Sequence, residues 1–206
     1  MMLVPGCLCA YLLGGVPFAY LAVRLCKGID LRTIGSGNVG ATNASRAFEG
    51  RSARLSAFLA IYLLDAAKGF VPVWWGPQLL GAQEPVFAGV ALGAAAILGH
   101  VFTPYLRFRG GKGVATACGV LLALDWMSLL LALAAFLLVR IATGEVFFGS
   151  IALGFGLAIG TVALHPDDAF AGRLPVTVMA VVLALFLLWT HRSNLRKHFG
   201  AKAGAA

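Results

Sequence analysis

The sequence predicts an all-α fold, a multi-pass transmembrane helical bundle of about seven spans. Of the 206 residues, 60% are hydrophobic and only 12% are charged, whereas a soluble domain carries roughly 25% charged residues. The mean hydropathy is +0.90, and the apolar residues gather in seven separate runs. Because a transmembrane helix needs about 20 apolar residues, seven spans use about 140 residues and leave room for one domain over residues 1–206.

The hydrophobic runs give the order of the expected helices. They fall at about residues 3–25, 53–75, 85–105, 114–124, 127–141, 147–164 and 175–189. The first run lacks the basic start of a secretory signal, so we expect it to be a retained span. The fourth and fifth runs are short for a bilayer, and a shallow turn at Asp125-Trp126 would part them. A count of five or six spans is therefore an alternative to seven.

The charges predict the orientation. The net charge is +8, and fourteen of the 16 Lys and Arg residues, all except Lys68 and Arg173, fall on alternate connecting segments. Basic loops face the cytoplasm, so we expect the N-terminus outside and the C-terminus in the cytoplasm. This orientation explains the positive charge better than nucleic-acid binding does, because no long basic run is present.

The cysteines and histidines predict neither a metal site nor a cofactor. Cys7, Cys9, Cys26 and Cys118 form no CxxC pair. No histidine has a cysteine or a second histidine at the spacing of metal ligands. We therefore expect four free thiols that pack as small apolar groups.

The first polar segment, residues 35–46, reads GSGNVGATNASR. Its glycines expose backbone N–H groups, its hydroxyls and amides add donors, and Arg46 adds a fork-shaped guanidinium. Such a set of donors suits an anion, most plausibly a phosphate. Residues 35–40 match the dinucleotide motif GxGxxG, but no strand precedes them and no parallel sheet is expected. The plain alternative is a flexible loop with an incidental positive end.

The second polar segment covers residues 100–116 and contains GGKG at 110–113. This string resembles half of a Walker A loop, but the full motif fails at its first glycine and at its last hydroxyl, so an ATPase is not indicated. Lys112 stands just before an expected helix N-terminus, where an anion is favoured. His100 has two open interpretations, a site residue or a buried structural histidine.

The third polar segment, residues 191–197, closes the last apolar run. If it is helical, His191 and Asn194 share one face. A histidine there is a base, a donor or simply a polar edge. With the predicted orientation, all three polar segments lie on the cytoplasmic side, which favours a site role.

Two smaller features add candidates. Asp65 and Lys68 lie one helical turn apart inside the second apolar run. A charge at mid-bilayer costs about 2.5–3.5 kcal/mol on insertion scales, so the pair is either functional or a structural ion pair. Thr143 lies just after the fifth run and either offers its hydroxyl to a substrate or caps a helix.

Taken together, these strings resemble the bacterial acyl-phosphate:glycerol-3-phosphate acyltransferase family. The resemblance covers nearly the whole chain. It rests on residues 35–46, on Gly99-His100 with 110–116, on 191–194 with Arg196, and on 64–69. The chain departs from the family pattern at residues 143–145, where a serine-rich stretch is expected.

The resemblance implies a multi-pass enzyme of the bacterial plasma (inner) membrane whose active site faces the cytoplasm. It implies transfer of a fatty acyl group from acyl phosphate to the 1-hydroxyl of glycerol 3-phosphate, giving lysophosphatidic acid and phosphate. No cofactor is implied. The expected partners are the two substrates, the bilayer and a soluble enzyme that makes acyl phosphate. A membrane transporter of a phosphorylated metabolite is the alternative.

These considerations give a set of expected site residues. We expect phosphate binding by Arg46, Lys112, Ser36 and Asn194, and an oxyanion donor at Asn38 or Asn43. We also expect Gly110 and Gly111 to let backbone N–H groups reach the acyl phosphate. His191 is the expected base, unless the departing phosphate takes the proton. The catalytic candidates are His191, Asn38 and Asn43; the substrate-binding candidates are Ser36, Gly37, Thr42, Arg46, Gly110, Gly111, Lys112, Thr143 and Asn194; the candidate supporting residues are Asp65, Lys68 and His100.

Overall fold

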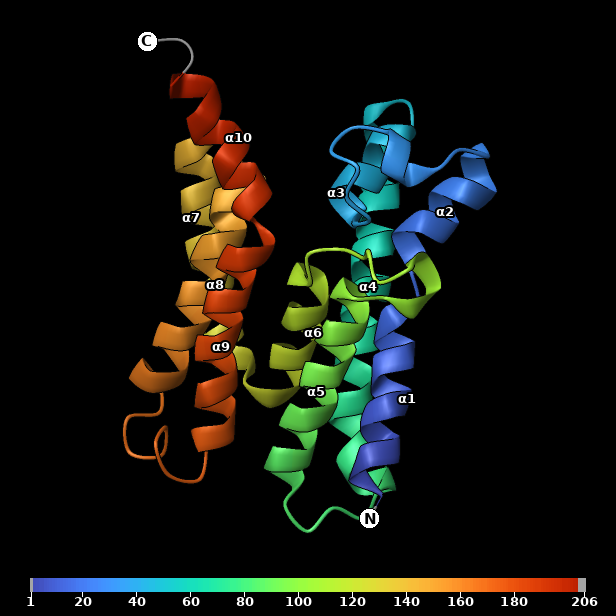
Figure 1. Ribbon diagram of the computed structural model, residues 1–206. Helices are drawn as coiled ribbons and strands as arrows, with labels where there is room; N and C mark the ends of the chain where they lie inside the picture. Colours follow the sequence, from blue (N-terminus) through green and yellow to red (C-terminus); the bar gives the residue numbers. More distant parts are fainter. Residues whose placement is uncertain (1, 204–206) are drawn as a thin grey trace. The chain divides into compact units, whose positions relative to one another are not determined.

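The protein is helical throughout the described part of the chain. The structure, a computed structural model, describes residues 2–203 and contains no strand in that range (Figure 1). This confirms the predicted all-α class. The chain divides into two compact units, the first ending at Leu124 and the second beginning at Asp125. The expectation of one domain over residues 1–206 stays a prediction.

The first unit is built from five longer helices. In its centre, α4 packs against both α5 and α6, and α1 packs against α5. Glycines let these helices approach closely, as is usual for helices packed in a membrane: a Cβ on Gly99 would lie 2.0 Å from the Tyr11 carbonyl oxygen, and one on Gly119 would lie 1.9 Å from that of Ala66. The helices are α1 (Leu3–Gly15), α2 (Phe18–Lys27), α4 (Arg51–Leu79), α5 (Pro85–Val101) and α6 (Val114–Leu124), with the single turn α3 (Ala41–Ala44) between α2 and α4.

The first apolar run is not one continuous helix. It breaks between α1 and α2 at Val16 and Pro17. Proline has no N–H to donate and clashes with the preceding turn, which explains the break. The break leaves carbonyl oxygens of Gly15 and Val16 available to side chains of other helices, and both are used.

The second unit contains α7 (Trp126–Thr143), α8 (Val146–Ala163), α9 (Leu174–Thr190) and α10 (Arg192–Ala203). The α8 helix packs on both α7 and α9. Gly144, with φ of +73°, ends α7 in the left-handed conformation that glycine adopts without strain. A Cβ on Gly156 would lie 2.9 Å from the Cα atom of Ala132, so this glycine permits the α7–α8 contact.

Asp125 ties the start of α7 to the segment before α9. Its carboxylate accepts hydrogen bonds from the Ser128 N–H (3.1 Å) and hydroxyl (2.7 Å), and it lies 2.7 Å from Arg173 Nη2 and 3.3 Å from His165 Nε2. Burial acts to raise the pKa of Asp125, but the bonds from Ser128 and the charge of Arg173 outweigh it and hold the pKa below its usual range.

Every predicted apolar run is helical. Within residues 2–203, five helical stretches are long and apolar enough to cross a membrane by themselves, and the pair α9 and α10, bent by 46°, would give a sixth. The α6 helix, with 11 residues, is shorter than the about 20 that a span needs. Seven spans and the outside N-terminus therefore stay predictions. The five stretches are Leu3–Lys27, Arg51–Leu79, Pro85–Leu106, Trp126–Thr143 and Val146–Ala163.

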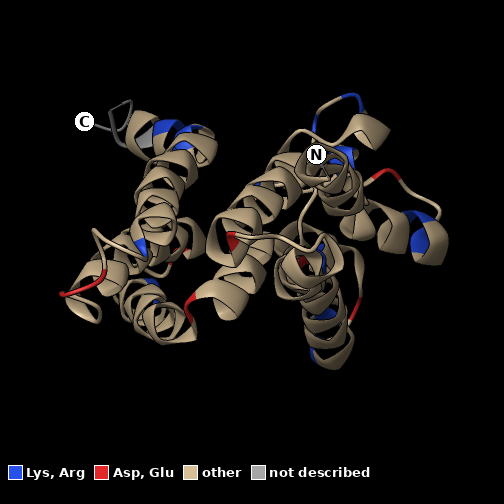
Figure 2. Cartoon of the chain, turned by 90° about the horizontal axis from the view of Figure 1, so that it is seen from below, with Lys and Arg blue, Asp and Glu red and all other residues tan. Residues whose placement is uncertain are grey.

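The outward faces of the helices are apolar. In α7, Leu138 and Ile141 are 69% and 71% exposed. Most of the ribbon in Figure 2 carries neither basic nor acidic residues. A helix that is apolar all round suits a lipid environment, so these surfaces fit a multi-pass membrane protein.

Candidate active site

The first polar segment is organised around one buried amide, that of Asn43. Its side chain is 2% exposed. Its Nδ2 donates to the carbonyl oxygens of Leu31 (3.3 Å), Ile34 (3.1 Å) and Asn38 (3.0 Å), and its Oδ1 accepts from the N–H of Ser36 (3.0 Å). A single side chain thus closes the loop 31–38 onto α3.

These bonds correct the role expected for Asn43. An amide has two N–H bonds to donate, and here they face three main-chain carbonyl oxygens. This arrangement leaves no donor for an oxyanion. Asn43 instead positions the backbone that carries Ser36 and Asn38.

The loop held by Asn43 presents the other expected residues of the first segment. Gly35 and Gly37 have φ of +55° and +70°, in the left-handed region that glycine tolerates. The Arg46 guanidinium lies over Gly35, because its Nη1 is 3.1 Å from where a Cβ on Gly35 would be. Ser36 is exposed, and its hydroxyl accepts from the Asn38 N–H at 3.4 Å.

Thr42 is exposed on the short helix α3, next to Asn43 in the chain. Its carbonyl oxygen accepts a hydrogen bond from the Ser45 hydroxyl at 3.1 Å. The predicted substrate-binding role of Thr42 stays a prediction.

The second polar segment doubles back onto the end of α5. Gly110 N–H donates to the Val101 carbonyl oxygen (2.9 Å), and Gly111 N–H donates to that of His100 (3.1 Å). A Cβ on Gly110 would lie 2.0 Å from the His100 carbonyl oxygen, so only glycine permits this approach. The glycines' own N–H groups are thus bonded to main chain, and the expectation that the two glycines let backbone N–H groups reach the acyl phosphate stays a prediction.

The two polar segments meet at Gly111. A Cβ there would lie 2.8 Å from the carbonyl oxygen of Val39, which belongs to the first segment. Lys112 follows directly and is half-buried, and Gly113, with φ of +84°, leads into the first turn of α6. The structure thus brings together the first polar segment, which also contains Arg46, and the turn that carries Lys112.

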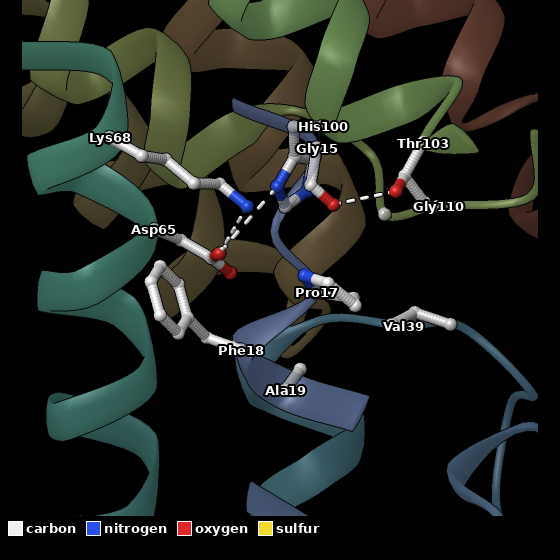
Figure 3. Close-up of a pocket in the computed structure, with 11 residues that line it drawn as sticks. Gly15, Pro17, Phe18, Ala19, Val39, Asp65, Lys68, His100, Thr103 and Gly110 are labelled. Atoms are coloured by element: carbon white, nitrogen blue, oxygen red, sulfur yellow. Dashed lines mark hydrogen bonds and ion pairs between the residues drawn. The ribbon is translucent and has the colours of Figure 1, made fainter. Parts of the chain in front are cut away.

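Beneath this junction lies a cluster of three buried ionisable side chains, Asp65 and Lys68 from α4 and His100 from α5 (Figure 3). They are 2%, 3% and 7% exposed. Asp65 Oδ1 lies 2.8 Å from Lys68 Nζ and 3.6 Å from His100 Nδ1. All three candidate supporting residues therefore lie in one cluster.

The cluster also contacts the break between α1 and α2. Lys68 Nζ donates to the Val16 carbonyl oxygen at 2.8 Å, and the hydroxyl of Thr103 donates to that of Gly15 at 2.6 Å. A small pocket between these groups is also lined by Phe18 and Val39. Sequence reasoning missed these main-chain acceptors, although the proline that follows two glycines and a valine was a signal for the break.

In the second unit, His191 is buried between α9 and α10. Its Nδ1 lies 2.8 Å from the Leu187 carbonyl oxygen. A carbonyl oxygen only accepts, so Nδ1 carries a hydrogen. When the ring is neutral its lone pair is then on Nε2, which is the form that a base requires.

Asn194 and Thr143 complete the second unit's candidates. Asn194 N–H donates to the His191 carbonyl oxygen at 2.9 Å, so the two residues share a helical turn. Thr143 Oγ1 donates to the Val139 carbonyl oxygen at 2.7 Å and accepts from the Glu145 N–H at 3.2 Å. These bonds support the capping interpretation of Thr143; its contact with substrate stays a prediction.

Comparison with known proteins decides the family. A sequence profile described as glycerol-3-phosphate acyltransferase matches residues 4–200. The chain belongs to the glycerol-3-phosphate acyltransferase family. Proteins of that name from Myxococcus xanthus and Aromatoleum aromaticum are 40% and 42% identical to it, over 91% and 92% of this chain and 91% and 89% of their own.

Solved structures of the family share the fold. Two crystal structures of PlsY (YgiH), an integral membrane glycerol 3-phosphate acyltransferase, match with TM-scores of 0.82 and 0.81. They are 30% and 29% identical to this chain, cover 97% of it, and are themselves covered over 94% and 93%. One is the glycerol 3-phosphate form and the other the lysophosphatidic acid form.

The family assignment confirms the resemblance drawn from the polar segments. The chain is an integral membrane acyltransferase that acts on glycerol 3-phosphate, which favours the enzyme over the transporter.

Proposed function

We propose that this enzyme takes its acyl group from acyl phosphate and transfers it to the 1-hydroxyl of glycerol 3-phosphate. The products are lysophosphatidic acid and inorganic phosphate. The observation that carries the proposal is the junction in the first unit, where the Arg46 loop and the Lys112 turn meet at Gly111 and Val39. Two cationic side chains on adjoining loops suit reactants that each carry a phosphate.

The site residues divide between the two phosphates and the reacting carbonyl. Arg46 and Ser36 hold the phosphate of glycerol 3-phosphate, with Gly37 and Thr42 beside them in the same segment. Lys112 holds phosphate oxygens of the donor, and Asn194 is a further proposed phosphate ligand. Asn38 is the oxyanion donor that remains once Asn43 is assigned to the loop. Because the amide N–H groups of Gly110 and Gly111 bond to main chain, these glycines contribute by the close approach they allow.

The chemistry needs one proton acceptor and one leaving group. The 1-hydroxyl oxygen attacks the acyl carbon, the bond from that carbon to the phosphate oxygen breaks, and the electron pair leaves with phosphate. The hydroxyl proton goes to His191 Nε2, consistent with the hydrogen held on Nδ1 by the Leu187 carbonyl. If phosphate itself takes the proton, catalysis rests on positioning and charge stabilisation.

The setting is also part of the proposal. The basic residues on alternate segments support an enzyme of the bacterial inner membrane whose polar segments face the cytoplasm, with the N-terminus outside. A cytoplasmic site would receive acyl phosphate from the soluble enzyme that makes it.

The donor is tested with purified protein in detergent. Glycerol 3-phosphate is supplied with acyl phosphate, acyl-CoA or acyl-carrier protein, and lysophosphatidic acid and phosphate are measured. We expect one phosphate per lysophosphatidic acid with acyl phosphate and no product with the other donors. Product from a thioester donor alone would overturn the donor assignment.

The phosphate site is tested with Arg46→Ala, which should raise the KM for glycerol 3-phosphate by about 10-fold or more, as expected for the loss of a charge-assisted hydrogen bond. Arg51→Ala, at an exposed arginine that begins α4, is the matched control and should leave KM within about twofold. An unchanged KM in Arg46→Ala would refute the assignment.

A further inference from the structure

The buried Asp65–Lys68–His100 cluster calls for a function, because ionisable side chains inside a membrane protein are costly. A structural ion pair that braces α4 is the simplest explanation. That explanation accounts for the 2.8 Å contact of Lys68 with Asp65, since both lie on the same helix. It does not account for His100, which comes from α5 and lies 3.6 Å from the same carboxylate oxygen.

His100 connects the cluster to the polar segments. Its ring packs directly against Gly111, because a Cβ on that glycine would lie 2.1 Å from His100 Nε2. Its carbonyl oxygen accepts the Gly111 N–H at 3.1 Å. The ring and the backbone of His100 therefore both contact the turn that carries Lys112, and they determine its position.

Asp65 and Lys68 hold the other side of this arrangement. Asp65 faces His100 Nδ1, and Lys68 donates to the Val16 carbonyl oxygen at the break between α1 and α2. Lys68 Nζ also lies 5.6 Å from the centre of the Phe18 ring, which begins α2. Residues 28–34 connect α2 to the first polar segment, and Val39 of that segment lines the same pocket as the cluster. The cluster therefore lies next to both segments.

We propose that Asp65, Lys68 and His100 form a positioning network that fixes the Gly110–Lys112 turn against Val39 and so places the Lys112 ammonium for phosphate. None of the three needs to touch substrate for this role. The proposal rests on the proposed function, in which Lys112 binds phosphate. The two explanations differ in what the cluster affects. A structural ion pair affects only the stability of the fold, whereas a positioning network also raises the rate of turnover by placing Lys112.

The first experiment removes the charges as a pair. Asp65→Asn with Lys68→Met leaves no unpaired buried charge, and such neutral replacements are often tolerated by the fold. We expect correctly folded protein with turnover reduced about 100-fold, the loss that a shift of about 1 Å can produce in an enzyme site. Wild-type turnover in this folded double variant would overturn the proposal and favour a purely structural ion pair.

The second experiment is a double-mutant cycle with Lys112→Ala, using His100→Asn, which leaves Asp65 and Lys68 in place. If His100 acts through Lys112, His100→Asn lowers kcat/KM in the wild type but causes less than about twofold further loss in Lys112→Ala. Losses that multiply would show independent roles and overturn the proposal. The double-mutant cycle also tests the proposal if the Asp65→Asn, Lys68→Met variant fails to fold.

The cycle separates this proposal from the proposed function. Lys112→Ala alone tests whether Lys112 matters for phosphate, read as the KM for acyl phosphate and the inhibition by inorganic phosphate. If Lys112→Ala changes neither, the phosphate assignment fails. If it changes both while His100→Asn adds its full loss, only the positioning network fails. Unfolding temperatures of all variants exclude a general loss of fold as the cause.

Discussion

Replacement of Asn43 by alanine tests the distinction between positioning and catalysis most sharply within the first polar segment. The change removes two N–H donors, shared among the carbonyl oxygens of Leu31, Ile34 and Asn38, and one acceptor of the Ser36 N–H. At about 0.5–1.5 kcal/mol for each of these three bonds, the free energy that orders the loop falls by roughly 1.5–4.5 kcal/mol.

The lower end of that range is the relevant one for Asn43→Ala. Three of the four main-chain contacts are only partly buried, so the freed main-chain groups can bond to water. A loss of about 2 kcal/mol corresponds to about 30-fold in the population of the ordered loop. Because substrate then has to order the loop when it binds, the KM for glycerol 3-phosphate rises by up to about 30-fold.

Steady-state kinetics of Asn43→Ala with purified enzyme separate the two roles. The positioning role predicts a raised KM for glycerol 3-phosphate with a smaller change in kcat. Ser45→Ala is the control, because it removes one exposed bond in the same turn, to the Thr42 carbonyl oxygen, and should behave as wild type. A large fall in kcat at unchanged KM would restore Asn43 as an oxyanion donor and refute this reasoning.

Two further predictions follow from close contacts and from charge. Gly111→Ala places a Cβ 2.1 Å from His100 Nε2, at least 1.3 Å short of the ordinary 3.4 Å contact, and should lower kcat/KM about 100-fold. The control is Gly28→Asn, at a glycine with φ of +71° and open space around it, which should keep full activity. Equal losses of activity in the two variants would contradict the contact argument. Because the pKa of Asp125 is depressed in the folded state, its carboxylate stabilises the protein above the unfolded pKa of about 3.9, and that stability is lost as pH falls through the folded pKa. Unfolding temperatures of wild type and Asp125→Asn should therefore converge below about pH 4, whereas a pH-independent difference would contradict this origin.

Hydropathy predicted the helices well because it is a local property. Every apolar run is helical, the first one as two helices, and the run at 114–124 has the bounds of α6. The break at Pro17 was missed because hydropathy measures how apolar the side chains are and not whether the helix is continuous. A long apolar stretch is therefore predicted as one span. The number of spans depends on tilt and on where the bilayer lies, which length and composition do not fix.

The site residues were harder to rank because donors look alike in a sequence. Asn38 and Asn43 stand five residues apart in one polar segment, yet the structure commits the Asn43 amide to main-chain carbonyls. The glycines at 110 and 111 suggested open N–H groups, whereas their small size is what allows contact with His100 and Val39. The link from Asp65 to His100 joins two helices and has no signal in local spacing.

The most direct test of the central claim is a crystal structure of this protein with glycerol 3-phosphate bound. We predict the phosphate within about 3.2 Å of the Arg46 guanidinium and of Ser36, on the loop that Asn43 closes and beside the Lys112 turn. A phosphate bound outside the first polar segment, with Arg46 turned away from it, would contradict the claim.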